Sequence, residues 1–180
     1  MDIGSNYGCH SIGVANHIKN ENGSGKVYSF DIQKEITKIF KENVSMNSLD
    51  NYINIYEYGL GDKNENKDFV TPTNYDNNEN PGGLSLLNQN LSDQYKKDSI
   101  TVKRLDDLYI DNISLIKIDI EGYELEALEG GINTIRKNKP IILIEIWKKN
   151  IEKYKSWINT NFSFYNIENI SNDDYLLRPV

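Results

Sequence analysis

The sequence predicts an α/β fold with a mostly parallel sheet and an antiparallel hairpin near its C-terminal end. Apolar runs at 115–118 and 141–146 are continuous, which is typical of parallel strands that helices cover on both faces. Strand-like and helix-like segments alternate along the chain, as they do in α/β proteins. Candidate strands at 164–170 and 175–178 are joined by residues 171–174 only, and so short a connection requires antiparallel pairing.

Each remaining element follows from apolar periodicity and from the residues that end it. The expected helix at 123–136 carries one apolar stripe, with spacings of three and four residues, and Pro140 ends that region before the next strand. In chain order we expect a helix at 11–18, a strand at 27–30, a helix at 33–43, a strand at 53–58, a strand at 115–118, a helix at 123–136, a strand at 141–146 and a helix at 150–159.

A polar, Asn-rich segment at 63–98 interrupts this alternation. It is too long for an ordinary connection, and it is either a disordered insert or a loop near the active site that carries substrate contacts, with room for a short hairpin. Its most turn-like part is 81–85. We expect residues 1–180 to form one domain that contains this insert.

Composition and charge exclude several classes of protein. The net charge of −7 repels nucleic acid, so we expect no nucleic-acid partner. The single cysteine, Cys9, excludes an internal disulfide and a zinc site built from thiolates. Because no apolar run is long enough to span a membrane and no signal-peptide pattern is visible, we expect a cytoplasmic protein. The oligomeric state stays open.

Two glycines near the start of the chain suggest a ligand loop between a strand and a helix. Gly4 and Gly8 allow close backbone approach, and Asp31, after the next strand, could hold both hydroxyls of a ribose or cap the following helix. NAD and S-adenosylmethionine both suit this pattern. A dinucleotide site favours glycine where this chain has Asn6, and Asp2 could meet the charged amino-acid end of S-adenosylmethionine.

Acidic residues follow the strand at 115–118. Asp119 and Glu121 are either charges at a helix N-terminus or active-site groups, because ligands of open α/β sheets bind at the carboxyl ends of the strands. Alternate residues on a helix point apart, so we expect no converging carboxylates among 119–126 and no required metal. We expect Lys117 to pair with a nearby acid.

Six ordered motifs together resemble FkbM-type S-adenosylmethionine-dependent methyltransferases. The most specific is Lys-Ile-Asp-Ile-Glu-Gly at 117–122, followed by Leu-Glu-Gly-Gly at 128–131. The motifs lie at 2–8, 27–31, 60–62, 105–108, 116–124 and 140–145.

The resemblance implies a class I methyltransferase (Rossmann-like) sheet whose last strand is antiparallel. It also implies O-methylation of a hydroxyl on a sugar, glycan or small metabolite, with S-adenosylmethionine as the cofactor. The implied positions are these: Gly4, Asn6 and Gly8 line the cofactor, Asp31 binds the ribose, Asp62 approaches the adenine, and Asp119 faces the methyl-transfer region. As candidate bases for the acceptor hydroxyl we rank Asp119 first, then Glu121, then Glu145.

The chain departs from the family pattern in two ways. The family usually has Glu where this chain has Asp31, which keeps the same hydrogen-bonding capacity. Met1 stands just before the motif that should follow the first strand, so we expect that strand to be truncated. The truncation leaves open a non-catalytic, methyltransferase-like remnant. The pattern of glycines and Asp31, which NAD also suits, leaves open a nicotinamide-dependent oxidoreductase.

Overall fold

The computed structural model describes the backbone of residues 1–72 and 95–180, and the side chains of 1–68 and 99–180. The chain divides into two compact units, Met1–Gly59 and Leu60–Val180. The expectation of one domain over 1–180 stays a prediction.

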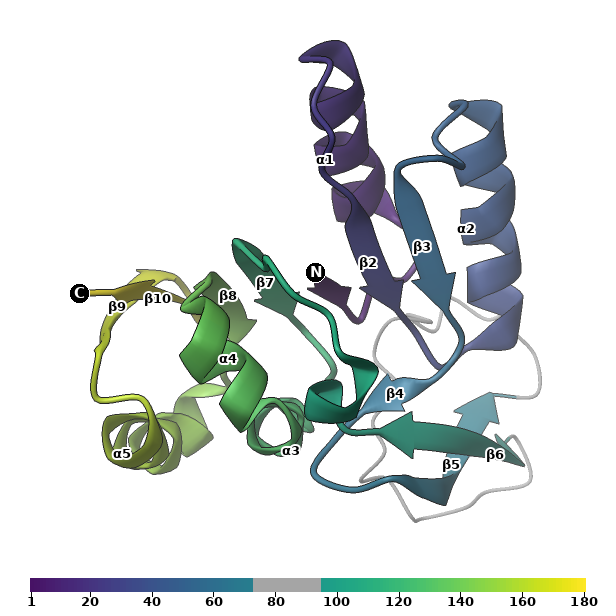
Figure 1. Cartoon of the computed structure of the whole chain (residues 1–180). Helices are drawn as coiled ribbons and strands as arrows, with labels where there is room; N and C mark the ends of the chain where they lie inside the picture. Colours follow the sequence, from purple (N-terminus) through teal and green to yellow (C-terminus); the bar gives the residue numbers. More distant parts are fainter. Residues whose placement is uncertain (73–94) are drawn as a thin grey trace. The chain divides into compact units, whose positions relative to one another are not determined.

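The first unit is a parallel three-stranded layer with two helices (Figure 1). Its strand order is β3-β2-β1, and the register pairs Ile3 with Phe30 and Phe30 with Tyr56. Because the carboxyl ends of the strands align, the residues that follow β1 and β2 meet at one edge. The elements are β1 (Asp2–Ile3), α1 (Cys9–Asn20), β2 (Val27–Phe30), α2 (Lys34–Met46) and β3 (Ile53–Tyr56).

Both helices of the first unit pack on the same face of its strands. One apolar cluster draws on α1, α2, β2 and β3 and contains Ala15, Val27, Phe40, Val44, Leu49 and Ile53. The side chains that alternate with these along the strands include the aromatic rings of Phe30 and Tyr56, which stack with centroids 4.9 Å apart. Phe30 is 1% exposed, so the end of β2 is held firmly.

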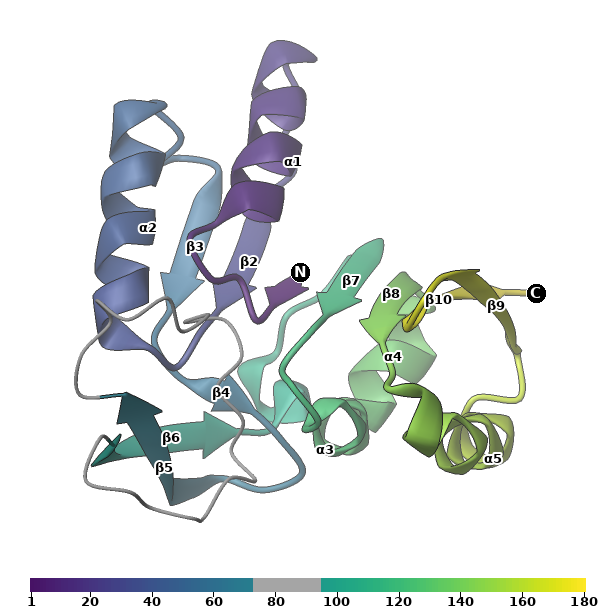
Figure 2. The same ribbon diagram turned by 180° about the vertical axis from the view of Figure 1, so that it is seen from behind.

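The second unit contains a four-stranded run and a smaller sheet (Figure 2). The run has the order β7-β8-β10-β9, in which β7 and β8 are parallel and β10 is antiparallel to both of its neighbours. Its elements are β7 (Leu115–Ile118), α3 (Glu124–Gly130), α4 (Ile132–Asn138), β8 (Ile141–Glu145), α5 (Ile151–Asn161), β9 (Tyr165–Ser171) and β10 (Asp174–Pro179), with short 3₁₀ turns η1 (Leu105–Leu108) and η2 (Lys148–Asn150).

These elements confirm the predicted α/β class with parallel strands and a C-terminal antiparallel hairpin. The hairpin connection is tighter than expected, because β9 ends at Ser171 and β10 begins at Asp174. β1 is present as a two-residue strand that pairs with β2. None of the helices among the described residues is long and apolar enough to cross a membrane.

The expectation of one helix over 123–136 is wrong, because the helix is interrupted at Gly131. Two consecutive glycines favour the interruption, since glycine is a poor helix former. Gly130 also has no room for a side chain, because a Cβ there would lie 1.8 Å from the carbonyl oxygen of Gly61. The glycine pair therefore allows close backbone approach at the cost of helix continuity.

The two ends of the polar segment at 63–98 lie in two strands that pair with each other. β5 (Glu65–Pro72) pairs antiparallel with β6 (Tyr95–Lys103), and β4 (Gly59–Leu60) completes a sheet of order β4-β6-β5. The turn expected at 81–85 lies outside the described residues, and the substrate contacts expected of this segment stay a prediction.

Gly8→Ala should destabilise the protein by about 2–4 kcal/mol, because two costs add. Gly8 has φ of 85°, and a Cβ there would lie 1.9 Å from Cε2 of the buried Phe40 ring. Gly13→Ala is the matched control. Gly13 lies within α1 with no atom within 4 Å of an added Cβ, so alanine should stabilise by about 0.5–1 kcal/mol. Urea unfolding measures both changes, and a Gly8→Ala variant as stable as the wild type would contradict this account.

Candidate functional site

The loop between β1 and α1 is fixed on the end of β2. Three of its residues have positive φ, at 83° for Gly4, 49° for Asn6 and 85° for Gly8. The N–H groups of Gly4 and Ser5 both donate to the carbonyl oxygen of Phe30, at 2.9 and 3.1 Å. The glycines predicted from the sequence therefore shape a tight turn that lies against the neighbouring strand.

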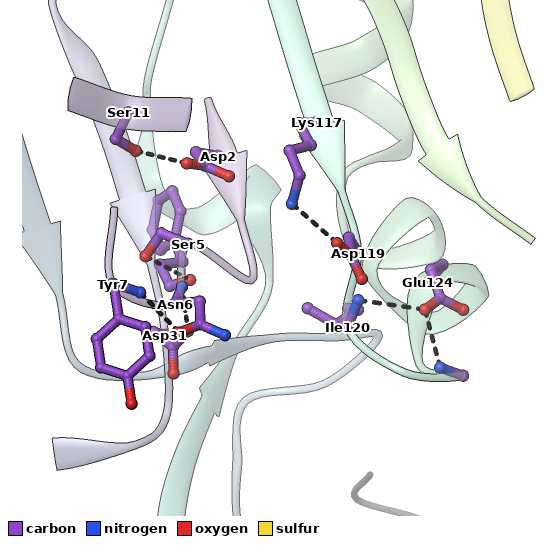
Figure 3. A network of polar contacts seen from close by, with 12 residues as sticks. Asp2, Ser5, Asn6, Tyr7, Ser11, Asp31, Lys117, Asp119, Ile120 and Glu124 are labelled. Atoms are coloured by element: carbon purple, nitrogen blue, oxygen red, sulfur yellow. Dashed lines mark hydrogen bonds and ion pairs between the residues drawn. The ribbon is translucent and has the colours of Figure 1, made fainter. Parts of the chain in front are cut away.

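The Asp31 carboxylate joins this loop to the start of α2 (Figure 3). Its Oδ2 accepts the N–H of Asn6 at 2.8 Å, and its Oδ1 accepts the N–H of Gln33 at 3.0 Å. Asp31 is 8% exposed, and this burial raises its pKa while the backbone N–H donors oppose the shift. Gln33 is itself the N-cap residue of α2, so Asp31 holds the residue before the helix and is not its N-cap. Because the N–H of Ile32 is a third backbone donor, the carboxylate keeps one lone pair for a ligand hydroxyl.

Asp2 is a second buried carboxylate in the same unit. Ser11 Oγ donates to Asp2 Oδ2 at 2.5 Å, and the hydroxyls of Ser11 and Ser29 are 2.8 Å apart. The negative charge of Asp2 contributes to raising the pKa of Asp31, after the larger effect of burial. Two buried negative charges favour a positively charged ligand near this loop and oppose a phosphate.

The backbone amides of the loop already have acceptors within the protein. Gly4 and Ser5 donate to Phe30, Asn6 donates to Asp31, the N–H of Tyr7 donates to Asn6 Oδ1 at 2.7 Å, and the N–H of Gly8 donates to Ser5 O at 2.8 Å. A pyrophosphate site relies on free backbone N–H groups that point at the ligand. Residues 4–8 do not supply such a set.

The second unit brings three half-buried carboxylates together. β7 and β8 are parallel with Ile118 opposite Ile144, so Asp119 and Glu145 come next to each other at the carboxyl ends of adjacent strands. Glu121 lies on the following turn with φ of 55°. One carboxylate oxygen from each of these three residues lies within 4.8 Å of the other two.

The expectation that no carboxylates converge here is therefore wrong. It assumed a helix over these residues, whereas 119–122 form a turn and α3 starts only at Glu124. Three converging carboxylates have the oxygen chemistry that hard cations prefer. Acidic clusters are also common without an ion, and we assign none to this one.

Charge repulsion and burial set the protonation of this cluster. Burial, followed by the negative charges of Asp119 and Glu121 and a hydrogen bond with Asp119, raises the pKa of Glu145 to about 7. Burial and the charges of Asp119 and Glu124 also raise the pKa of Glu121. The expected ion pair of Lys117 is confirmed, since its Nζ lies 3.2 Å from Asp119 Oδ2 (Figure 3).

Sequence reasoning missed the role of Glu124 and Tyr154. Glu124 is 3% exposed and accepts hydrogen bonds from the N–H groups of Ile120 and Gly122 and from the Tyr154 hydroxyl. An acidic residue two positions after Gly122 was the available signal for Glu124, whereas nothing local marks Tyr154. Asp62, expected near an adenine, lies after β4 with Lys63 Nζ 3.6 Å from its Oδ2, and its role stays a prediction.

Comparison with known proteins gives a match to one family model. The family model of the methyltransferase FkbM domain matches residues 2–173. No curated protein matches the chain.

Three solved structures illustrate the shared fold. Methyltransferase FkbM from Methylobacillus flagellatus KT has a TM-score of 0.66 at 20% identity, over 98% of this chain and 42% of that one. An rRNA methylase from Streptococcus thermophilus has a TM-score of 0.56 at 12% identity, and the match covers 99% of this chain and 84% of that one. Precorrin-6y C5,15-methyltransferase from Geobacter metallireducens GS-15 has a TM-score of 0.54 at 12% identity, and the match covers 98% of this chain and 74% of that one. The chain thus spans less than half of the first of these proteins.

Glu145→Gln should change the pH dependence of stability in a defined direction. Folding raises the pKa of Glu145 from 4.5 to about 7, so the wild type binds an extra proton when folded and loses stability as the pH rises through that interval. The variant lacks this loss, so its free energy of unfolding, relative to that of the wild type, should increase between about pH 4.5 and pH 7.

Urea unfolding from pH 4 to pH 8 measures this difference, and Glu57→Gln provides a control of opposite sign. The hydrogen bond from Lys41 lowers the pKa of Glu57, so ionised Glu57 stabilises the folded wild type above about pH 4.5. The free energy of unfolding of Glu57→Gln should therefore be lower than that of the wild type, and the two should converge only as the pH falls below about 4.5. A Glu145→Gln difference that is flat from pH 4.5 to pH 7 would contradict the raised pKa.

Proposed function

Because this chain belongs to the methyltransferase FkbM domain family, we propose that it transfers a methyl group from S-adenosylmethionine to a hydroxyl of a sugar, glycan or other small metabolite. S-adenosylmethionine supplies an electrophilic methyl group on a positively charged sulfur. The residues of the chain bind and orient the reactants, exclude water and accept a proton.

The observation that carries this proposal is the chemistry of the β1–α1 loop. Its amides already have acceptors and two buried carboxylates lie in the same unit, which favours a cationic nucleoside over a dinucleotide phosphate. We propose that Gly4, Asn6 and Gly8 line the cofactor and that Asp31 accepts a ribose hydroxyl through its remaining lone pair. Asp2 contributes a negative charge that suits the ammonium and sulfonium groups.

The proposed proton acceptor for the hydroxyl is Glu145. A base works best when its pKa is near the working pH, and the pKa of Glu145 is raised to about 7. Asp119, the first choice from sequence, is held in an ion pair by Lys117. We propose that Asp119 and Glu121 supply the negative charges that keep Glu145 basic.

The acceptor is proposed from charge and chemistry. A protein of net charge −7 repels a phosphate backbone, so a nucleic acid is a poor acceptor and a neutral hydroxyl compound is favoured. We propose Asp62 as the residue near the adenine, and a cytoplasmic location for the protein.

Calorimetric titration with S-adenosylhomocysteine and with NAD tests the cofactor. We expect saturable binding of S-adenosylhomocysteine and none of NAD. Asp31→Asn should weaken binding by roughly tenfold or more, because a neutral amide with one acceptor oxygen replaces a charged acceptor with two. Glu42→Gln, an exposed change on α2, is the control and should bind like the wild type. Binding of neither compound supports the non-catalytic alternative, and binding of NAD alone supports an oxidoreductase.

Transfer from methyl-labelled S-adenosylmethionine to a panel of monosaccharides and hydroxylated metabolites tests the base. With saturating cofactor, the rate should rise with pH around 7, and Glu145→Gln should lower kcat roughly a hundredfold or more. Asp119→Asn should shift that rise to lower pH, because it removes a charge that raises the pKa of Glu145. If Glu145→Gln keeps the wild-type rate while Asp119→Asn abolishes it, the base is Asp119.

A further inference from the structure

We propose that Glu124 is a positioning residue for methyl transfer, because its buried carboxylate clamps the turn that presents Asp119 and Glu121. This inference rests on the proposed function, in which the carboxylate cluster of Asp119, Glu121 and Glu145 handles the acceptor proton. Glu124 lies at the start of α3 and is outside that cluster of three.

One oxygen of Glu124 holds the turn on both sides of Glu121 (Figure 3). Oε1 accepts the N–H of Gly122 at 2.8 Å and the N–H of Ile120 at 3.2 Å. Glu121 lies between these two residues and has φ of 55°, a backbone conformation that residues other than glycine rarely adopt. The surrounding structure must hold such a residue in place, and the two bonds to Glu124 do so.

The other oxygen fixes the clamp to a distant helix. Tyr154 on α5 donates its hydroxyl to Glu124 Oε2 at 3.0 Å, and both residues are 3% exposed. Burial and the charge of Glu124 raise the pKa of Tyr154, so the tyrosine stays a protonated donor. A buried carboxylate is tolerated when it is fully hydrogen bonded, and here three donors satisfy it.

Glu124 acts through the turn and not on the substrate. Its oxygens are engaged and buried, which leaves it poorly suited to receive a proton from a ligand. What it controls is the geometry of its neighbours: with the turn clamped, the carboxylates of Asp119, Glu121 and Glu145 converge within 4.8 Å. Without the clamp, Glu121 is free to leave its left-handed conformation, and the cluster separates.

Replacement of Glu124 distinguishes the clamp from simple packing. Glu124→Gln keeps an oxygen that accepts both N–H groups and places its amide against the Tyr154 oxygen, whereas Glu124→Leu keeps volume but no acceptor. Tyr154→Phe removes the third donor and leaves the two backbone bonds intact. Glu129→Leu, an exposed change on the same helix, is the matched control.

Two readouts are compared in the full chain. Amide hydrogen exchange, followed by NMR, reports the bonds from Ile120 and Gly122 without any need for activity. Transfer of labelled methyl to the acceptor panel gives kcat and KM, and calorimetry with S-adenosylhomocysteine gives the cofactor affinity.

For Glu124→Leu we expect loss of exchange protection at Ile120 and Gly122 and a fall in kcat of roughly tenfold to a hundredfold, with cofactor affinity unchanged. Glu124→Gln should keep the exchange protection and most of the wild-type kcat, and Tyr154→Phe should give values between those of the leucine and glutamine variants.

If the leucine variant does not fold, the glutamine and phenylalanine variants are compared with the wild type instead. Protection or kcat at the wild-type level in Glu124→Leu overturns the proposal, as does a Glu124→Gln variant with unprotected amides. A wild type that transfers no methyl but shows the expected exchange pattern contradicts the proposed function alone.

Discussion

The hydrogen bonding of the Asp31 carboxylate is the interaction on which the carboxyl end of the parallel strands in the first unit depends. The carboxylate accepts the N–H of Asn6 from the β1–α1 loop and the N–H of Gln33 from the start of α2. A single buried side chain thus fixes two backbone segments that no strand pairing joins directly. The same geometry makes Asp31 both a link between backbone segments and a candidate ligand group, because three backbone donors leave the carboxylate one lone pair to offer.

Parallel strand pairing plays the corresponding role in the second unit. Asp119 and Glu145 are far apart in the sequence, and the register that sets Ile118 opposite Ile144 brings them together. Like charges held this close oppose one another's ionisation, which is why the pKa of Glu145 is raised towards neutrality. In both units, the candidate carboxylates lie where strands end, which is where ligands of open α/β sheets bind.

The sequence was sufficient for the features that depend on local pattern. Gly4, Gly8 and Asp31 follow from turn chemistry and strand position, and the alternation of strands and helices predicted the α/β class. The convergence of Asp119, Glu121 and Glu145 was not predictable in this way, because it needs the register of two strands and the left-handed turn at Glu121. Tyr154 carries no local signal, and the close approach of Gly130 to Gly61 depends on packing between segments that are far apart in the sequence.

The most direct test of the central claim is an NMR titration of the isotope-labelled chain with S-adenosylhomocysteine. The account predicts that the amide signals of Asn6 and Gln33, the two donors to Asp31, shift saturably and together. Signals that stay unchanged at saturating ligand, or that move only in residues remote from the β1–α1 loop and Asp31, would contradict it.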